Sequence, residues 1–201
     1  MDGRYSYAVS LQDDVGHFCG GSLISKDVVL TAAHCEQEGA FRVVIGRHNL
    51  YSTDGDEVYI KTQMPHPKYN WKNTNNDFML IFLGRPTLAD VEVVKLNSDR
   101  AVPTVNDSVT VMGWGDTVAS DYIQTLSSVL QAVELGMISN TECESSKGFH
   151  GGVYEEFEGD ITRNMMCAKD SHQDACQGDS GELRTDEKLC IFIFIYLFSW
   201  K

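Results

Sequence analysis

The chain has 201 residues, of which 42% are hydrophobic and 22% are charged. This composition is typical of a folded globular protein and argues against a disordered one. The 16 Lys and Arg residues stand against 29 Asp and Glu residues, giving a formal net charge of −13, and an acidic surface repels the phosphate backbone of nucleic acids. We therefore expect one large or two small globular domains and no nucleic-acid partner.

Short runs rich in β-branched and aromatic residues recur along the chain and predict strands. Clusters of Gly, Asn, Asp and Ser separate them, as at residues 52–56 and 73–77. No long stretch has the 3.6-residue period of an amphipathic helix, so an all-β sandwich or barrel is predicted. The polar segment 97–106, which contains Pro103, is the predicted junction between two strand-rich halves. The predicted strands are residues 5–11, 28–30, 41–45, 58–60, 78–83, 109–112 and 129–135.

Neither end of the chain predicts a membrane anchor. Residues 1–4 are polar and are not followed by the apolar core of a signal peptide. The longest apolar run, residues 189–200, is shorter than the roughly 20 residues that an α-helix needs to span a bilayer. We expect no contact with a membrane.

The cysteines favour an oxidising compartment, because their number is even and their spacing is scattered. No C-x-x-C pair occurs, which argues against a zinc ribbon or a thioredoxin-like redox motif, and no pair of histidines has the spacing of metal ligands. Six cysteines allow fifteen pairings, so their number alone fixes none of them. They are Cys19, Cys35, Cys143, Cys167, Cys176 and Cys190.

Three segments carry residues suited to nucleophilic catalysis. In Leu-Thr-Ala-Ala-His34-Cys35, small residues precede an imidazole beside a cysteine, although a lone histidine is usually structural. In Asn-Asp77-Phe-Met-Leu, an acid opens an apolar strand, and alone it indicates no more than the start of that strand. In Asp174-Ala-Cys-Gln-Gly-Asp-Ser180-Gly, a serine lies between an acid and a glycine, and glycines let the backbone approach a substrate closely.

Taken together, these segments resemble the chymotrypsin/trypsin family of serine endopeptidases, and the order His, Asp, Ser along the chain is the order in that family. The resemblance extends over roughly residues 3–181. It implies an all-β fold of two packed antiparallel barrels, the first over about residues 1–97 and the second over about residues 98–181, with the active site in the cleft between them. Further similar segments are residues 3–12, Cys-Gly-Gly-Ser-Leu-Ile at 19–24, His-Pro-Lys-Tyr at 66–69, Gly-Trp-Gly at 113–115 and Asn-Met-Met-Cys-Ala at 164–168.

The resemblance implies peptide hydrolysis by acyl transfer. Ser180 is expected to attack the scissile carbonyl, His34 to act as the base and Asp77 to orient the imidazole. The backbone N–H groups of Gly178 and Ser180 are expected to form the oxyanion hole. Asp174, six residues before Ser180, aligns with the base of the family's specificity pocket and implies cleavage after Lys or Arg. No cofactor is expected.

The resemblance also implies a secreted protein, which we expect to be a monomer, with disulfides Cys19–Cys35 and Cys143–Cys167. Proximity in the sequence suggests Cys176–Cys190 as a third pair, although the family's partner of the first of these cysteines lies on a strand that this chain lacks. Some members of the family bind calcium in the loop that aligns with residues 47–57. Here Arg47 stands at a position where calcium binders carry an acid, so we expect no metal there.

The chain departs from the family at both ends. It begins after the segment whose freed amino group pairs with the acid before the nucleophile, here Asp179, and this leaves the active geometry in doubt. The resemblance stops at Gly181, so the second barrel is expected to be incomplete and residues 182–201 to form an unrelated apolar tail. We interpret the tail as a reading-frame artefact, with a replacement strand or hydrophobic plug as the alternative. A catalytically inactive relative that acts as a binding module, and a non-functional fragment, are the alternatives for the whole chain.

Overall fold

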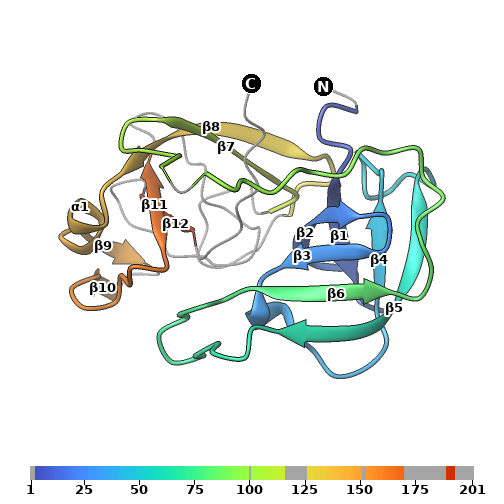
Figure 1. The fold of residues 1–201 in the computed structure, drawn as a ribbon, viewed down its shortest axis with the longest axis horizontal. Coiled ribbons are helices and arrows are strands. Elements are labelled where there is room, and N and C mark those ends of the chain that lie inside the picture. The colour runs from blue at the N-terminus through green and yellow to red at the C-terminus, as the bar shows by residue number, and fades with distance from the viewer. Residues whose placement is uncertain (1–2, 100, 116–125, 151–152, 170–188, 193–201) are drawn as a thin grey trace.

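The computed structural model describes residues 3–99, 101–115, 126–150, 153–169 and 189–192 (Figure 1). In this part of the chain no helix is long and apolar enough to cross a membrane. Two strand-rich halves lie side by side, with a single five-residue α-helix among the described residues. The prediction of an all-β fold is confirmed.

The first half is a closed barrel of six strands in the order β1-β2-β3-β6-β5-β4. Antiparallel pairing of β1 with β4 closes the ring, with Val9 opposite Ile45. Side chains that point inward fill it; on β6 they are Met79, Ile81 and Leu83, which alternate with half-buried neighbours. The strands are β1 (Ala8–Gln12), β2 (His17–Ser25), β3 (Val28–Thr31), β4 (Arg42–Ile45), β5 (Asp56–Pro65) and β6 (Met79–Leu83).

β2 is not among the strands predicted from the sequence, because its central Gly20 and Gly21 have low strand propensity. The packing explains why glycine is found there. A Cβ atom at Gly21 would lie 2.9 Å from a methyl carbon of Val29 and 3.0 Å from the carbonyl oxygen of Leu30. The close approach of β1, β2 and β3 at this point therefore requires a residue without a side chain.

The described part of the second half is an open sheet with strand order β12-β11-β8-β7 and a separate hairpin of β9 and β10. Val109, Leu135, Met137 and Ala168 form a small core on the sheet. The expectation of one complete barrel and one incomplete one agrees with this arrangement. The elements are β7 (Ser108–Gly113), β8 (Gln131–Ile138), α1 (Asn140–Glu144), β9 (Lys147–His150), β10 (Val153–Glu156), β11 (Met166–Lys169) and β12 (Leu189–Phe192).

The last described strand, β12, comes from the apolar run near the end of the chain. Its backbone pairs antiparallel with β11, and Cys190 lies opposite Ala168. Part of this run, residues 189–192, therefore adds a strand to the second sheet. Cys176 lies outside the described residues, and the suggested Cys176–Cys190 pair remains a prediction.

The two halves are joined by hydrogen bonds around Trp114, at the end of β7. The indole Nε1 of Trp114 donates to the carbonyl oxygen of His48 at 3.0 Å, and the ring is only 1% exposed. The backbone N–H of Leu130 donates to the same oxygen at 2.9 Å, and the N–H of Leu50 donates to the oxygen of Ser128 at 2.7 Å. These contacts extend from the first barrel to the segment that leads into β8.

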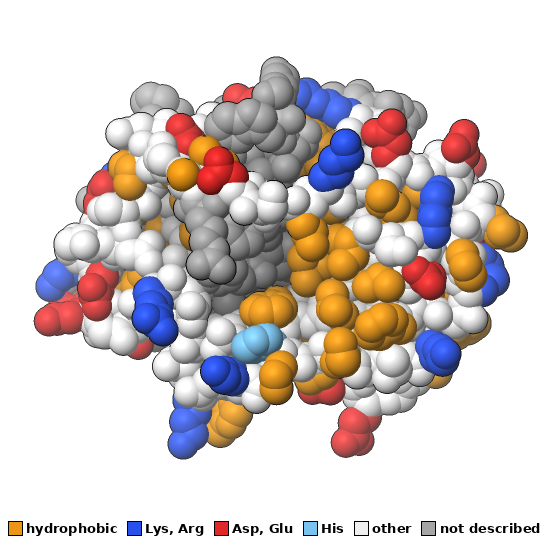
Figure 2. All heavy atoms as spheres, in the orientation of Figure 1, with side chains coloured by type: hydrophobic (Ala, Val, Ile, Leu, Met, Phe, Trp, Pro, Cys, Tyr) orange, Lys and Arg blue, Asp and Glu red, His pale blue; other side chains and the backbone are white. Residues whose placement is uncertain are grey.

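One face of the molecule carries many hydrophobic side chains over the first barrel, whereas charged side chains of both signs lie scattered around its edge (Figure 2). Over the whole described surface, the large hydrophobic side chains that are more than half exposed are Val15, Tyr51, Tyr59, Met64, Trp71, Leu88 and Leu96. The negative net charge is therefore not gathered into a single acidic patch on this face.

Candidate active site

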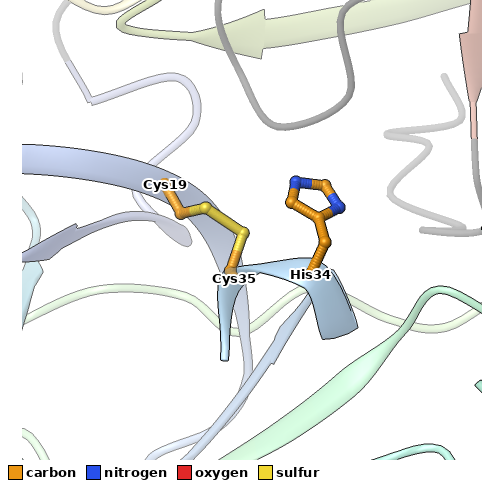
Figure 3. A group of neighbouring side chains, drawn as sticks. All are labelled: Cys19, His34 and Cys35. Carbon is orange, nitrogen blue, oxygen red and sulfur yellow. A yellow bond between two sulfur atoms is a disulfide. The ribbon is translucent and has the colours of Figure 1, made fainter. Parts of the chain in front are cut away.

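The imidazole of His34 stands at the edge of the first barrel on a short 3-10 helix, η1 (Ala33–Cys35), which follows β3 directly. The backbone N–H of Glu36 donates to the oxygen of Ala33 at 3.0 Å and closes this turn. A disulfide joins Cys35 to Cys19 on β2, so η1 is tied to the barrel wall beside His34 (Figure 3). The side chain of His34 is 31% exposed and remains accessible.

Strand pairing brings Asp77 to the same edge. β3 and β6 are antiparallel neighbours, with Thr31 opposite Met79. His34 lies three residues after Thr31 and Asp77 two residues before Met79, so both residues leave their strands at the same end of the pair. Residues 43 positions apart in the sequence thereby become neighbours.

Asp77 holds His34 by two hydrogen bonds and is itself fully buried, with 0% of its side chain exposed. Its Oδ1 accepts from the backbone N–H of His34 at 2.8 Å, and its Oδ2 lies 2.6 Å from Nδ1 of the imidazole. Because an ionised carboxylate can only accept hydrogen bonds, the proton of the neutral imidazole is on Nδ1. Nε2 is then left with its lone pair free to act as a base.

Tyr69 lies half-buried near this carboxylate and responds to its charge. Burial raises the pKa of the Tyr69 hydroxyl, and the negative charge of Asp77 raises it further. Tyr69 belongs to the His-Pro-Lys-Tyr segment that contributed to the family resemblance, but the sequence alone suggested no place for it near Asp77.

The other residues predicted for catalysis and specificity lie outside the described residues. They are Ser180, Gly178, Asp174 and Asp179. Of the three residues expected to form the triad, the described structure therefore brings together two, His34 and Asp77. The segment that contains the rest lies between Lys169 and Leu189, which face each other across the β11–β12 pair.

A second disulfide, Cys143–Cys167, links α1 to β11. Both of its sulfur atoms are buried in a cluster with Phe157 and Met165. The strand that precedes the expected nucleophile segment is therefore fixed covalently to the helix on the other side of this cluster.

The first barrel offers one group of potential metal ligands among the described residues, formed by Cys19, His34 and Cys35. Their ligand atoms lie within 4.8 Å of one another. Both sulfur atoms are bonded to each other, however, and a disulfide has no thiolate to offer a metal. The proximity of these three residues is explained by the disulfide next to His34.

The loop over residues 47–57 does not fit the calcium site found in some relatives. Arg47 is only 8% exposed, and its guanidinium occupies the loop. Its Nε donates to the carbonyl oxygen of Asp54 at 2.8 Å, and its Nη2 lies 3.0 Å from Glu57 Oε1. The other carboxylate oxygen of Glu57 lies 3.2 Å from Nε of Arg42. The oxygens of Asp54 and Glu57 that a calcium ion would need are thus already bound to the guanidinium groups of Arg47 and Arg42.

We expect that millimolar calcium will not change the melting temperature of this protein, because Arg47 already supplies a positive charge to the loop. Replacing Arg47 with alanine should lower the free energy of unfolding by about 1–3 kcal/mol, since the oxygens of Asp54 and Glu57 lose a buried charged partner. Thermal and urea unfolding with and without calcium measure both effects. Lys61→Ala, which removes an exposed cation from β5, is the matched control. A rise of several degrees on adding calcium to the unaltered protein would contradict this prediction.

Comparisons with known proteins agree with the fold. The family model described as Trypsin matches residues 1–182. The chain is 35% identical to trypsin-4 of Rattus norvegicus over 179 residues, which cover 87% of this chain and 67% of the relative. It is 34% identical to trypsin of Sus scrofa, covering 87% of this chain and 71% of the relative. The chain thus spans about two thirds of the length of these relatives.

A solved structure is similar as well. Neuropsin, described as a serine protease expressed in the limbic system of mouse brain, superposes with a TM-score of 0.77. The superposition covers 94% of this chain and 81% of neuropsin, at 29% sequence identity. On the strength of the family match, the identity to the two trypsins and this superposition, the chain belongs to the trypsin family of serine proteases.

Proposed function

We propose that this protein is a serine endopeptidase that hydrolyses peptide bonds after Lys or Arg, with Ser180, His34 and Asp77 as its catalytic residues. The observation that carries the proposal is the fully buried carboxylate of Asp77, which accepts hydrogen bonds from both the backbone and Nδ1 of an accessible His34. That arrangement fixes the tautomer of a base and stabilises the cation that forms when the base takes up a proton.

In the proposed reaction, Oγ of Ser180 forms a bond to the carbonyl carbon of the substrate while its proton passes to Nε2 of His34. The carbonyl oxygen becomes negatively charged and accepts hydrogen bonds from the backbone N–H groups of Gly178 and Ser180. Collapse of this intermediate breaks the C–N bond, and the leaving amine takes the proton from His34. Water then repeats the sequence on the acyl-enzyme, releasing the acid and restoring Ser180.

The proposed preference for Lys and Arg rests on Asp174. A carboxylate at the base of a pocket pairs with a cationic side chain, and the pairing is strong where water is excluded. We also propose that the protein is extracellular and acts as a monomer on peptide and protein substrates. The two disulfides of the described structure suit that compartment.

Active-site labelling of the expressed 201-residue chain, alongside a form with family-type ends, tests the proposal. A fluorophosphonate probe reports an activated serine, and a chromogenic peptide ending in Arg reports cleavage. We expect labelling and cleavage in the form with family-type ends and neither in its Ser180→Ala variant. Ser127→Ala is a matched control, because this serine lies on the segment before β8 and accepts a hydrogen bond from the N–H of Val129.

Two results would overturn the proposal. Labelling that persists in Ser180→Ala would place the reactive serine elsewhere. If the chain and the form with family-type ends both fold and neither labels nor cleaves, the inactive relative is favoured, whose His34 and Asp77 have been retained without a function in catalysis.

A further inference from the structure

The loop between β5 and β6 reaches from the first barrel toward the half of the molecule that carries α1 and β9 to β11 (Figure 1). Its last part, residues 70–76, which we call the asparagine loop, ends directly before Asp77. The backbone N–H of Asn70 donates to the oxygen of Asn75 at 3.0 Å and closes the loop at its base. The conformation of this loop therefore sets the position of the Asp77 backbone.

The backbone on both sides of Asn75 is in a conformation that L-residues seldom adopt. Thr74 has φ 51° and Asn76 has φ 57°. Such left-handed conformations cost free energy in residues other than glycine, the more so in β-branched threonine, and persist where surrounding contacts hold them. The contacts that hold Asn75 therefore also help to hold the backbone that leads to Asp77, two residues further along.

Those contacts come from the other half of the molecule. Oδ1 of Asn75 accepts a hydrogen bond from Oγ1 of Thr162 at 3.1 Å and another from Nδ2 of Asn164 at 2.9 Å. Nδ2 of Asn164 also lies 3.4 Å from Oδ1 of Asn76. Two donors 87 and 89 residues away in the sequence thus converge on one amide oxygen of the asparagine loop.

The turn that supplies the donors is itself firmly held. Nδ2 of Asn140, at the start of α1, donates to the carbonyl oxygens of Thr162 and Met165, both at 3.0 Å. The N–H of Met165 donates to the oxygen of Thr162 at 3.0 Å, and the Met165 side chain is 4% exposed. Cys167, two residues further on, is joined to Cys143 of the same helix. The side chains of Thr162 and Asn164 therefore donate to Asn75 from a turn whose backbone is held in place.

From this chain of contacts we infer that Asn75 is a positioning residue, which sets Asp77, and through it His34, relative to the second half of the molecule. The inference rests on the proposed function, in which Asp77 orients the base. The turn at residues 162–165 leads directly into β11, after which the chain continues toward Ser180. The hydrogen bonds among Asn75, Thr162 and Asn164 thus connect the asparagine loop, which precedes Asp77, with the turn that leads into β11.

The first measurement is a proton NMR spectrum of the folded chain, in which the Nδ1–H of His34 bonded to Asp77 resonates at low field and is assigned by its loss in His34→Ala. In Asn75→Ala, which removes the acceptor of both cross-half hydrogen bonds, we expect this signal to move upfield or broaden. We expect kcat on the Arg-ended peptide to fall about tenfold, because displacements of 1 Å or less at a reacting group are costly. KM should change less than twofold, since Asn75 holds no part of the substrate pocket proposed above.

A matched pair at Thr162 keeps the test decisive if Asn75→Ala folds poorly. Thr162→Val has nearly the same shape but no hydroxyl, and it should reproduce both the shift of the His34 proton and part of the loss of kcat. Thr162→Ser retains the donor and should restore both. Asn97→Ala is the control, because Asn97 holds a turn by donating to Asp99 and Val102 without contacting the asparagine loop.

The two readouts separate this inference from the proposed function. If neither the unaltered chain nor the form with family-type ends cleaves, the proposed function fails, and the His34 proton still shows whether Asn75 positions the pair. If Asn75→Ala and Thr162→Val fold with the His34 proton and kcat both unchanged, the positioning role is overturned.

Discussion

Replacing Asp77 with asparagine is expected to lower kcat on an Arg-ended peptide by about 10⁴-fold, the size known for this change in the triad of related serine proteases. The side-chain oxygen of asparagine can still accept one of the two hydrogen bonds from His34, but its NH₂ group can only donate. An NH₂ group facing Nδ1 favours the tautomer with the proton on Nε2, and Nε2 then cannot take the proton of Ser180. Steady-state kinetics measure the loss.

Asp99→Asn is the matched control, because Asp99 caps an exposed turn by accepting from the N–H of Ala101 at 2.9 Å. It should leave kcat unchanged. Circular dichroism should show that both variants keep the strand content of the unaltered chain. An Asp77→Asn variant that folds and loses less than tenfold in kcat would mean that His34 does not act as a base held by this carboxylate.

Replacing Asp174 with serine is expected to lower kcat/KM for substrates with Arg before the cut by about 10²–10⁴-fold. Removing one partner of a buried ion pair costs about 3–5 kcal/mol, because the remaining charge is left without compensation. Substrates with an uncharged side chain at that position should lose much less. The ratio of kcat/KM for Arg-ended and Leu-ended peptides, measured in both proteins, isolates the effect on specificity.

The matched control for specificity is Asp160→Ser, which removes an exposed carboxylate outside the expected pocket and changes the net charge by the same amount. If it reduces the preference for Arg as much as Asp174→Ser does, the preference comes from the overall negative charge. In that case raising the salt concentration should weaken the preference as well, because long-range attraction between exposed charges is screened.

Much of the first half could be predicted from local patterns. The β-branched and aromatic runs mark β1, β3, β4 and β6. β6 alternates between the barrel core and a less buried face, whereas β1, β3 and β4 are buried along nearly their whole length and read as short apolar runs. His34 and Asp77 could be singled out because each stands in a short segment similar to the family's own. The strand register then explains their contact, since β3 and β6 pair with Thr31 opposite Met79.

The features that could not be predicted from the sequence depend on contacts between residues that are far apart in the chain. β2 contains Gly21 because three strands approach closely there, and a local propensity scale counts glycine only as a weak strand former. Asn75 looked like one more polar residue in a turn-rich run, and its donors lie 87 and 89 residues away. The excess of asparagine over residues 70–76 was the one available signal, and a turn was its ordinary interpretation.

The closed ring of the first barrel has a consequence for how such an enzyme can diversify. His34 and Asp77 both belong to this barrel, whose hydrogen-bonded ladder is complete when β1 pairs with β4. The proposed nucleophile and specificity carboxylate belong to a different stretch of the chain. Under the proposed function, substitutions that alter substrate choice can therefore accumulate in that stretch while His34 and Asp77 keep their support. The contacts through Asn75 and those around Trp114 are where the two parts must stay matched.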